Sequence, residues 1–393
     1  MRLSSSSALF FAALIGAGNL GASGSFASPR TPPPSSIVIY SFKGGADGAN
    51  PLAGLTLFNG ALYGTTSLGG ANGKGTVFKV STSGNESVLY SFAGQPDAAS
   101  PAASLIHVNG KLYGTTPVGG TINNGTVFEV SPSGHESVLY SFKFEPDGTN
   151  PYAGLTETNG ALYGTTSGGG TKDRGTVFEL SASGDESVIH SFTGEPDGES
   201  PFAGLTYLNG NLYGTTEHGG YGKKGGAGTV FEVSPSGSES VIHSFTGAHA
   251  GSSDGAWPLA GMIAVNGTLY GTTYEGGPAD EGAVFSVNPA GTEKAIYGFL
   301  GGDVYLDGAS PSASLTLLKG KLYGTTLYGG NNDSGTIFEV SKSGRESVVH
   351  DFQGSPADGA FPYGPLIVVN GMLYGTTANG GVNNDGTVFA LAP

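Results

Sequence analysis

The residue types that could recognise or transform a ligand gather in one stretch of this 393-residue chain, between residues 217 and 305. The stretch contains the only tryptophan, Trp257, among other aromatic, acidic and imidazole side chains. Aromatic platforms among carboxylates suit a sugar or peptide ligand, and a carboxylate beside a histidine suits proton transfer. The candidate ligand-binding residues are Trp257, Tyr274, Glu275, Glu217, His218, His249, Asp254 and Tyr305.

A repeated pentapeptide, first present as Leu62-Tyr63-Gly64-Thr65-Thr66, sets the framework that must position these residues. It occurs seven times, and successive copies are separated by 50, 50, 50, 57, 53 and 51 residues. A period near fifty indicates a repeat architecture, so one unit has to explain the whole chain. The tyrosines of the seven copies are Tyr63, Tyr113, Tyr163, Tyr213, Tyr270, Tyr323 and Tyr374.

Each repeat contains four runs with the composition of β-strands. In the first unit they cover residues 53–58, 61–66, 75–80 and 86–92, and each is bounded by Gly, Asn or Ser. Asn59-Gly60 joins the first two runs and is typical of a tight hairpin. Four antiparallel strands in about 50 residues predict the blade of a β-propeller. The fold class we expect is therefore all-β, a seven-bladed propeller.

The two ends of the repeat region predict how the ring closes. Residues 37–42 resemble a fourth strand with no preceding three, and residues 386–391 resemble a third strand with no fourth. The N-terminal strand should therefore complete the seventh blade by pairing with residues 386–391, which removes an open sheet edge.

The order of these segments resembles known repeat families. A hydrophobic strand, an NGxLY strand and a glycine pair resemble a kelch blade, although Gly69-Gly70 lies beyond the second strand and the fourth strand lacks tryptophan. Units such as residues 62–78, LYGTT followed by GG and GTVF, are closer to the Gloeo/Verruco (GloVer) tandem-repeat extracellular proteins of bacteria. That resemblance covers residues 37–393 and implies export and an extracellular location, without a known chemistry.

The N-terminus and the overall composition agree with export. Arg2, the apolar run 8–18 and the small residues that follow predict a signal peptide over residues 1–27. A Pro-rich linker, residues 28–36, leads into the propeller at 37–393. The apolar run is too short for a membrane span, and a net charge of −15 disfavours nucleic acid as a partner. We expect a secreted monomer.

An aspartate precedes a proline by four residues in every repeat, as in Asp47 and Pro51. Short Asp side chains usually accept hydrogen bonds from backbone amides in such crossovers. Calcium binding by some of these carboxylates is the minor alternative, and otherwise no cofactor or metal is expected. The histidines at 190, 243 and 350 replace a tyrosine present in the other blades, so they occupy a structural position.

The repeats differ where the loops lengthen. Blade four has three extra residues between its second and third strands, and the crossovers after blades four, five and six are also longer. Because strand direction alternates, all these insertions should lie on one face of the disc. Variable loops on a rigid scaffold commonly carry binding residues. Drift after duplication is the alternative.

We therefore interpret the chain as an extracellular binding or scaffold module for carbohydrate or a surface protein. The catalytic motifs of familiar hydrolases and zinc enzymes are absent from the sequence, which favours a non-enzymatic role. One alternative is a polysaccharide-acting hydrolase or lyase that uses Glu217 or Glu275 with His218. The other is a purely structural repeat protein.

Overall fold

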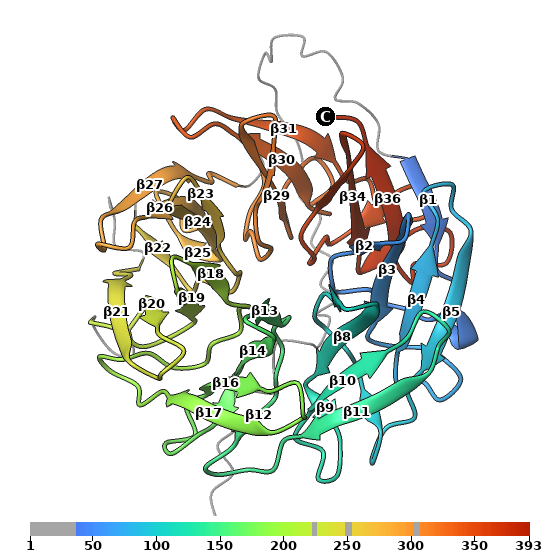
Figure 1. Ribbon diagram of the computed structural model, residues 1–393. Helices are drawn as coiled ribbons and strands as arrows, with labels where there is room; N and C mark the ends of the chain where they lie inside the picture. The colour runs from blue at the N-terminus through green and yellow to red at the C-terminus, as the bar shows by residue number, and fades with distance from the viewer. Residues whose placement is uncertain (1–36, 222–225, 248–253, 302–306) are drawn as a thin grey trace, which may run out of the picture. The chain divides into compact units, whose positions relative to one another are not determined.

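The computed structural model describes residues 37–221, 226–247, 254–301 and 307–393, all within one compact unit that spans residues 33–393. The described residues form seven four-stranded antiparallel sheets arranged as the blades of a ring (Figure 1). The predicted seven-bladed propeller is confirmed. The signal peptide and linker, residues 1–36, lie outside the described residues and remain predictions.

Each blade runs from a short inner strand to a longer outer one. Blade one comprises β2 (Thr56–Phe58), β3 (Ala61–Thr66), β4 (Thr76–Val80) and β5 (Glu86–Ser91). Blade two comprises β7 (Ile106–Val108), β8 (Lys111–Thr116), β10 (Thr126–Val130) and β11 (Glu136–Ser141). Blade three comprises β13 (Thr156–Thr158), β14 (Ala161–Thr166), β16 (Thr176–Leu180) and β17 (Glu186–Ser191). Blade four comprises β18 (Thr206–Leu208), β19 (Asn211–Thr216), β20 (Thr229–Val233) and β21 (Glu239–Ser244).

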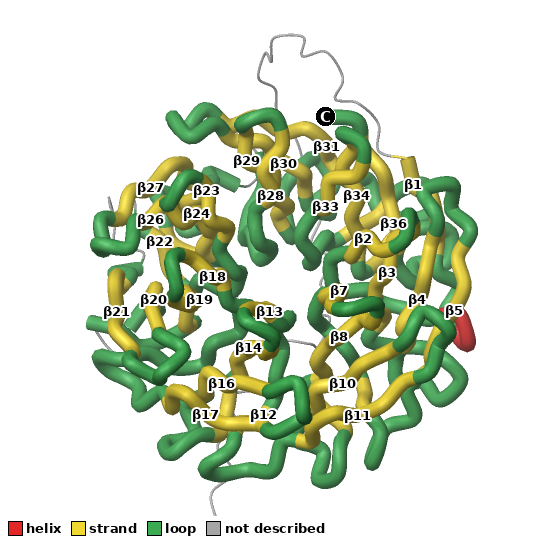
Figure 2. Tube along the Cα trace, viewed as in Figure 1, coloured by secondary structure: helices red, strands yellow, loops and turns green. Residues whose placement is uncertain are grey.

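The remaining blades repeat this order. Blade five comprises β23 (Ile263–Val265), β24 (Thr268–Thr273), β26 (Ala283–Val287) and β27 (Glu293–Gly298). Blade six comprises β28 (Thr316–Leu318), β29 (Lys321–Thr326), β30 (Thr336–Val340) and β31 (Glu346–Asp351). Blade seven comprises β33 (Ile367–Val369), β34 (Met372–Thr377), β36 (Thr387–Leu391) and β1 (Ile37–Ser41). Within the described residues, helix is limited to the short 3-10 turn η1 (Gly45–Asp47), red in Figure 2.

The ring closes as the sequence predicts. β1 pairs antiparallel with β36, and this join brings the blue and red ends of the described chain together in Figure 1. Phe42, just beyond β1, is fully buried and packs edge-to-face on Phe78 of blade one at 5.1 Å between centroids. The closing strand therefore ties blade seven to blade one as well as completing its own sheet.

The core consists of the interfaces between neighbouring blades. At each interface a phenylalanine that follows the outer strand packs edge-to-face on one from the third strand of the next blade, with centroids 5.0 to 5.2 Å apart. Edge-to-face geometry is preferred for aromatic pairs because the positive ring edge meets the negative face. The apolar residues on both faces of the strands are thereby buried.

The repeated pentapeptide is explained by this packing. A Cβ added at Gly64 would lie 2.6 Å from Cζ of Phe78, so only glycine leaves room for the core ring. The hydroxyls of Thr66 and Thr76 form a buried hydrogen bond at 2.8 Å between the second and third strands. The pentapeptide is a packing element.

None of the described helical segments is long and apolar enough to span a membrane.

Candidate ligand-binding site

The loop between the second and third strands of a blade pairs with the crossover that enters the same blade. Four such contacts are two-stranded sheets: β6 (Ala98–Ala99) with β9 (Val118–Gly119), β12 (Gly148–Thr149) with β15 (Gly168–Gly169), β22 (Gly255–Ala256) with β25 (Glu275–Gly276), and β32 (Gly359–Ala360) with β35 (Asn379–Gly380). The other three blades make single bridges, among them the bridge from Glu199 to His218. Both kinds of loop therefore lie on one face, as predicted, which we call the crossover face.

Trp257 and His218 meet on the crossover face between blades four and five. Their rings pack edge-to-face with centroids 5.9 Å apart, and both side chains are half-buried. Trp257 has a φ of 55°, and its backbone amide donates to the carbonyl of Ala227 at 2.9 Å. Asn50 and Asn150, at the same position in other blades, share that φ because asparagine tolerates the left-handed region. Tryptophan at such a position is unusual and points to a role for its side chain.

Tyr274 continues the aromatic surface from blade five toward blade six. Its amide donates to the carbonyl of Trp257 at 3.0 Å. Burial, and then the nearby phenol of Tyr328, raise the pKa of Tyr274. Tyr328 is 37% exposed and packs edge-to-face on Phe361 at 5.9 Å between centroids.

Tyr363, in the crossover into blade seven, completes the group. Burial, and then its neighbours Tyr328 and Tyr274, raise the pKa of Tyr363 to about 12. Six ring-bearing side chains therefore lie in neighbouring loops and crossovers of blades four to seven, and we call them the aromatic arc. The rings pair as His218 with Trp257 and as Tyr328 with Phe361, while Trp257 and Tyr274 meet through a backbone hydrogen bond. The aromatic arc comprises His218, Trp257, Tyr274, Tyr328, Phe361 and Tyr363.

Glu217 lies beside the aromatic arc. Only 7% of its surface is exposed, and burial raises its pKa to about 7. Its Oε2 lies 3.6 Å from Nε2 of His218. Burial, and then the charge of Arg174, lower the pKa of His218. Near neutral pH the carboxyl of Glu217 is partly protonated and the imidazole is mostly neutral, so this pair can exchange a proton with a bound hydroxyl group.

The other predicted site residues have different surroundings. Glu275 is half-buried in β25, opposite Ala256, and burial followed by the charges of Asp280 and Glu281 raises its pKa. Asp254 accepts hydrogen bonds from the amide and hydroxyl of Thr246, at 2.8 and 2.7 Å. It therefore stabilises the crossover, the role expected of its repeat position. His249 and Tyr305 lie outside the described residues.

Blades one to three present a different surface at the corresponding positions. Ser67, Pro117 and Ser167 stand in place of Tyr274, and Leu68, Val118 and Gly168 stand in place of Tyr328. At the position of Tyr363, however, Tyr152 of blade three and Phe202 of blade four are also aromatic, and their rings pack on each other at 5.3 Å between centroids. A pocket of about 250 Å³ lies between blades three and four, beside His218, and is lined by Arg174, Thr193, Gly194, Glu195, Glu199 and Gly219.

The sequence interpretation omitted Tyr328, Phe361 and Tyr363. Loop length could not indicate them, because Tyr328 lies in a loop of ordinary length and the other two lie beyond the single extra residue of their crossover. Tyr328 and Phe361 differ in side-chain type from most of their equivalents, so a comparison of the seven repeats could have found these two. It could not have found Tyr363, because Tyr152 and Phe202 at the same position are also aromatic. The site therefore extends beyond the lengthened loops, toward blade seven.

The comparison with known families agrees with this repeat geometry. The model of the Gloeobacter/Verrucomicrobia repeat matches residues 16–227 and 221–393. The chain belongs to this repeat family. Each Gloeobacter/Verrucomicrobia repeat of this chain forms one propeller blade. The side chains of the aromatic arc depart locally from the pattern that the repeats share. No curated protein matches the sequence.

Proposed function

We propose that this chain is an exported binding module whose aromatic arc takes a carbohydrate ligand. The observation that carries the proposal is the group of six rings from His218 to Tyr363, half-buried except for the exposed Tyr328, in neighbouring loops on one face of the propeller. Rings fixed by the fold lose little conformational entropy on binding, so they suit the apolar faces of sugars.

Polar groups beside the arc suit the hydroxyls of such a ligand. Glu217 and Glu275 supply carboxylate oxygens, and Tyr328 presents an exposed phenol that both donates and accepts. Ligand sites commonly combine apolar walls with a small number of such polar groups. The sequence indications of export agree with a ligand outside the cell.

A glycan array probed with the purified protein, followed by affinity electrophoresis on the polysaccharides that bind, tests this proposal. Trp257→Asn and Tyr274→Ser use residues found at the same positions of other blades, so both variants should fold. We expect each variant to lose binding by about tenfold or more, equivalent to roughly 1.4 kcal/mol. Binding that is unaffected by both changes, or binding only to proteins in a parallel surface-protein array, would overturn the carbohydrate proposal.

A polysaccharide-acting enzyme is the second candidate, favoured by the 3.6 Å separation of Glu217 and His218. Their opposite pKa shifts would let Glu217 donate a proton while His218 accepts one. Incubation with the polysaccharides that bind, monitored for new reducing ends or unsaturated products, distinguishes the two candidates. Products formed by the wild type but not by Glu217→Gln would establish the enzyme.

A further inference from the structure

Each complete crossover brings together three polar side chains from two neighbouring blades. The first comes from the outer strand, the second is the crossover aspartate, and the third is a glutamate that begins the outer strand of the next blade. In blade two the first is Tyr140, whose hydroxyl donates to Asp147 Oδ2 at 2.8 Å. The carboxylate of Glu186 faces the same two groups. The charge of Asp147 helps to raise the pKa of Glu186, and a proton or a cation shared by such a pair relieves the repulsion.

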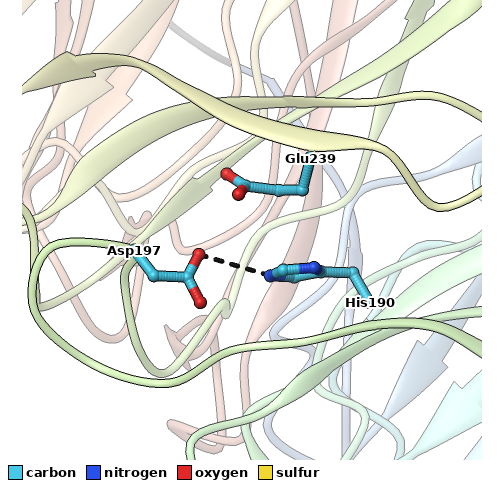
Figure 3. Close-up of side chains that lie close together, drawn as sticks. All are labelled: His190, Asp197 and Glu239. Atoms are coloured by element: carbon cyan, nitrogen blue, oxygen red, sulfur yellow. Dashed lines mark hydrogen bonds and ion pairs between the residues drawn. The ribbon is translucent and has the colours of Figure 1, made fainter.

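Blades three and four have histidine in place of that tyrosine. His190 lies with Asp197 and Glu239, and His243 lies with Asp254 and Glu293; in each trio the three ligand atoms are within 4.8 Å of one another. Figure 3 shows the first trio, in which the imidazole and both carboxylates point toward a common centre. We propose that each trio binds a zinc ion.

The separation of histidine and aspartate in each trio is longer than that of a strong ion pair and matches the spacing of two ligands on one metal ion. His190 Nε2 lies 3.3 Å from Asp197 Oδ1, and His243 Nε2 lies 3.6 Å from Asp254 Oδ1. A charge-assisted hydrogen bond is shorter, about 2.7 to 2.9 Å. Tetrahedral zinc with bonds of about 2.0 to 2.2 Å holds its ligand atoms roughly 3.3 to 3.6 Å apart.

A third histidine provides a comparison within the same chain. His350 Nε2 lies 2.9 Å from Asp358 Oδ2, the length of a direct hydrogen bond. The position that supplies the glutamate of the trios is Ser36 in the sequence of this blade. The wider spacing therefore occurs in the two trios that include glutamate.

Polar atoms in the two trios also lack other partners. Oε1 of Glu239, Oε1 of Glu293 and Nε2 of His243 are buried and have no hydrogen-bond partner among the described residues. The glutamate oxygens share this with Glu86, Glu136 and Glu186 of the tyrosine crossovers, so Nε2 of His243 is the atom particular to a trio. A buried polar atom without a partner is unfavourable, and a metal ion would satisfy all three. Two carboxylates with a neutral imidazole also carry the charge that a divalent cation neutralises.

Groups behind the ligands hold the aspartates in place. Thr193 donates both its amide, at 2.8 Å, and its hydroxyl, at 3.1 Å, to Asp197 Oδ2, and Thr246 does the same for Asp254. The other five crossovers have Lys43, Ala93, Lys143, Leu300 and Gln353 at this position. Threonine thus occurs at this position in the two trios alone. Oδ1 is the aspartate oxygen nearer the histidine in each trio, and in Asp254 it also accepts from the amide of Gly255 at 2.9 Å. Such outer hydrogen bonds commonly orient metal ligands.

The two ions would join the outer strands of neighbouring blades. One would link β17 to β21 and the other β21 to β27, so blade four would be held on both sides. Histidine with carboxylates favours zinc over calcium, which prefers oxygen ligands. The proposal does not depend on the carbohydrate function, because none of the ligands, which lie in the outer strands and the crossovers, belongs to the aromatic arc.

Tag-free protein treated with a chelator and then titrated with Zn²⁺ by calorimetry tests the proposal, with Ca²⁺ and Mg²⁺ as separate arms. His190→Tyr and His243→Tyr insert the residue of the other blades, and His350→Tyr is the matched control. We expect each of the first two variants to lose about half of the bound zinc, the double variant to lose all of it, and His350→Tyr to bind as the wild type does. Folding is checked by the far-UV circular dichroism of each variant.

Three results would overturn the proposal. The first is that the wild type does not bind zinc at micromolar concentrations. The second is that the double variant binds as much zinc as the wild type. The third is that His350→Tyr loses as much bound zinc as His190→Tyr or His243→Tyr. Thermal unfolding gives a second readout, because a ligand that binds only the folded state raises Tm. Zinc should raise the Tm of the wild type and leave that of the double variant unchanged.

Discussion

The hydroxyl of Tyr140 donates to Asp147 Oδ2 at 2.8 Å, and the amide of Lys143 donates to the same oxygen at 2.8 Å. This contact joins the outer strand of blade two to the crossover into blade three. Asp147 is buried, so its carboxylate depends on these donors. Tyr40, Tyr90 and Tyr297 make the same hydrogen bond to their crossover aspartates, and His350 lies 2.9 Å from Asp358 at the equivalent position.

Tyr140→Phe should destabilise the propeller because it leaves the buried carboxylate of Asp147 with one donor fewer. We expect the free energy of unfolding to fall by about 1 to 3 kcal/mol, measured by urea denaturation. Tyr207→Phe is the matched control, since Tyr207 is 40% exposed on an inner strand. Equal effects of the two changes would contradict a structural role for the Tyr140 bond.

Glu186 makes stability depend on pH. Burial, and then the charge of Asp147, raise its pKa to about 7, while the hydrogen bond from Tyr140 and the charge of Lys143 act in the opposite direction. Between the unfolded pKa of 4.5 and the folded value of about 7, the folded state binds more protons than the unfolded state. The contribution of Glu186 to stability is therefore greatest below pH 4.5 and is lost as the pH rises toward 7.

Glu186→Gln should remove this contribution, since the amide stays neutral at every pH. Denaturation curves from pH 4.5 to 7 should show a smaller decrease in stability for the variant than for the wild type. Glu157→Gln, which removes an exposed carboxylate from β13, serves as the control. If the two variants have the same pH profile, the burial of Glu186 has no effect on stability.

Closure of the ring by β1 gives a further prediction. Deletion of residues 1–42 removes β1 and Phe42 and exposes the edge of β36. Loss of a buried phenylalanine alone costs about 3 to 5 kcal/mol, and an open edge favours association. The truncated chain should have a lower Tm and elute as larger species in size-exclusion chromatography.

Deletion of residues 1–36, which precede the first strand, is the control for this truncation. That shorter deletion should keep the elution volume and Tm of the propeller. If the chain without residues 1–42 is monomeric and equally stable, the pairing of β1 with β36 is not needed for a stable ring.

The sequence predicted the blades well because each repeat contains the four strands of one blade, bounded by turn residues at a regular spacing. The second strand was predicted at 61–66 and is β3 (Ala61–Thr66), whereas the third was predicted from Gly75 and begins at Thr76. Gly75 has a φ of 94°, outside the range of a strand, and an added Cβ there would lie 2.3 Å from the carbonyl of Thr66. The first strand is shorter than expected, since it begins at Thr56 and not at Ala53. The carbonyl of Ala53 accepts from Thr376 of blade seven at 2.7 Å, a contact between blades that spacing alone cannot indicate.

The candidate site was predicted only in part. Loop length directed attention to Trp257 and Tyr274, which the fold places next to each other. It could not indicate Tyr328 or Tyr363, because their proximity depends on how blades six and seven meet on the crossover face. The interpretation of His190 and His243 as replacements for tyrosine was right about their position. It did not foresee the two carboxylates that converge on each ring.

The single tryptophan allows the most direct measurement of the proposed binding site, because all tryptophan emission comes from Trp257. Fluorescence titration with fragments of a polysaccharide that binds should give a saturable change in emission. Tyr328→Leu, which takes the residue at position 68, should weaken the apparent affinity by about tenfold or more. Tyr207→Leu, on an inner strand, should leave it unchanged. Binding detected by affinity electrophoresis with no change in Trp257 emission, or with equal affinity in all variants, would contradict a ligand site on the aromatic arc.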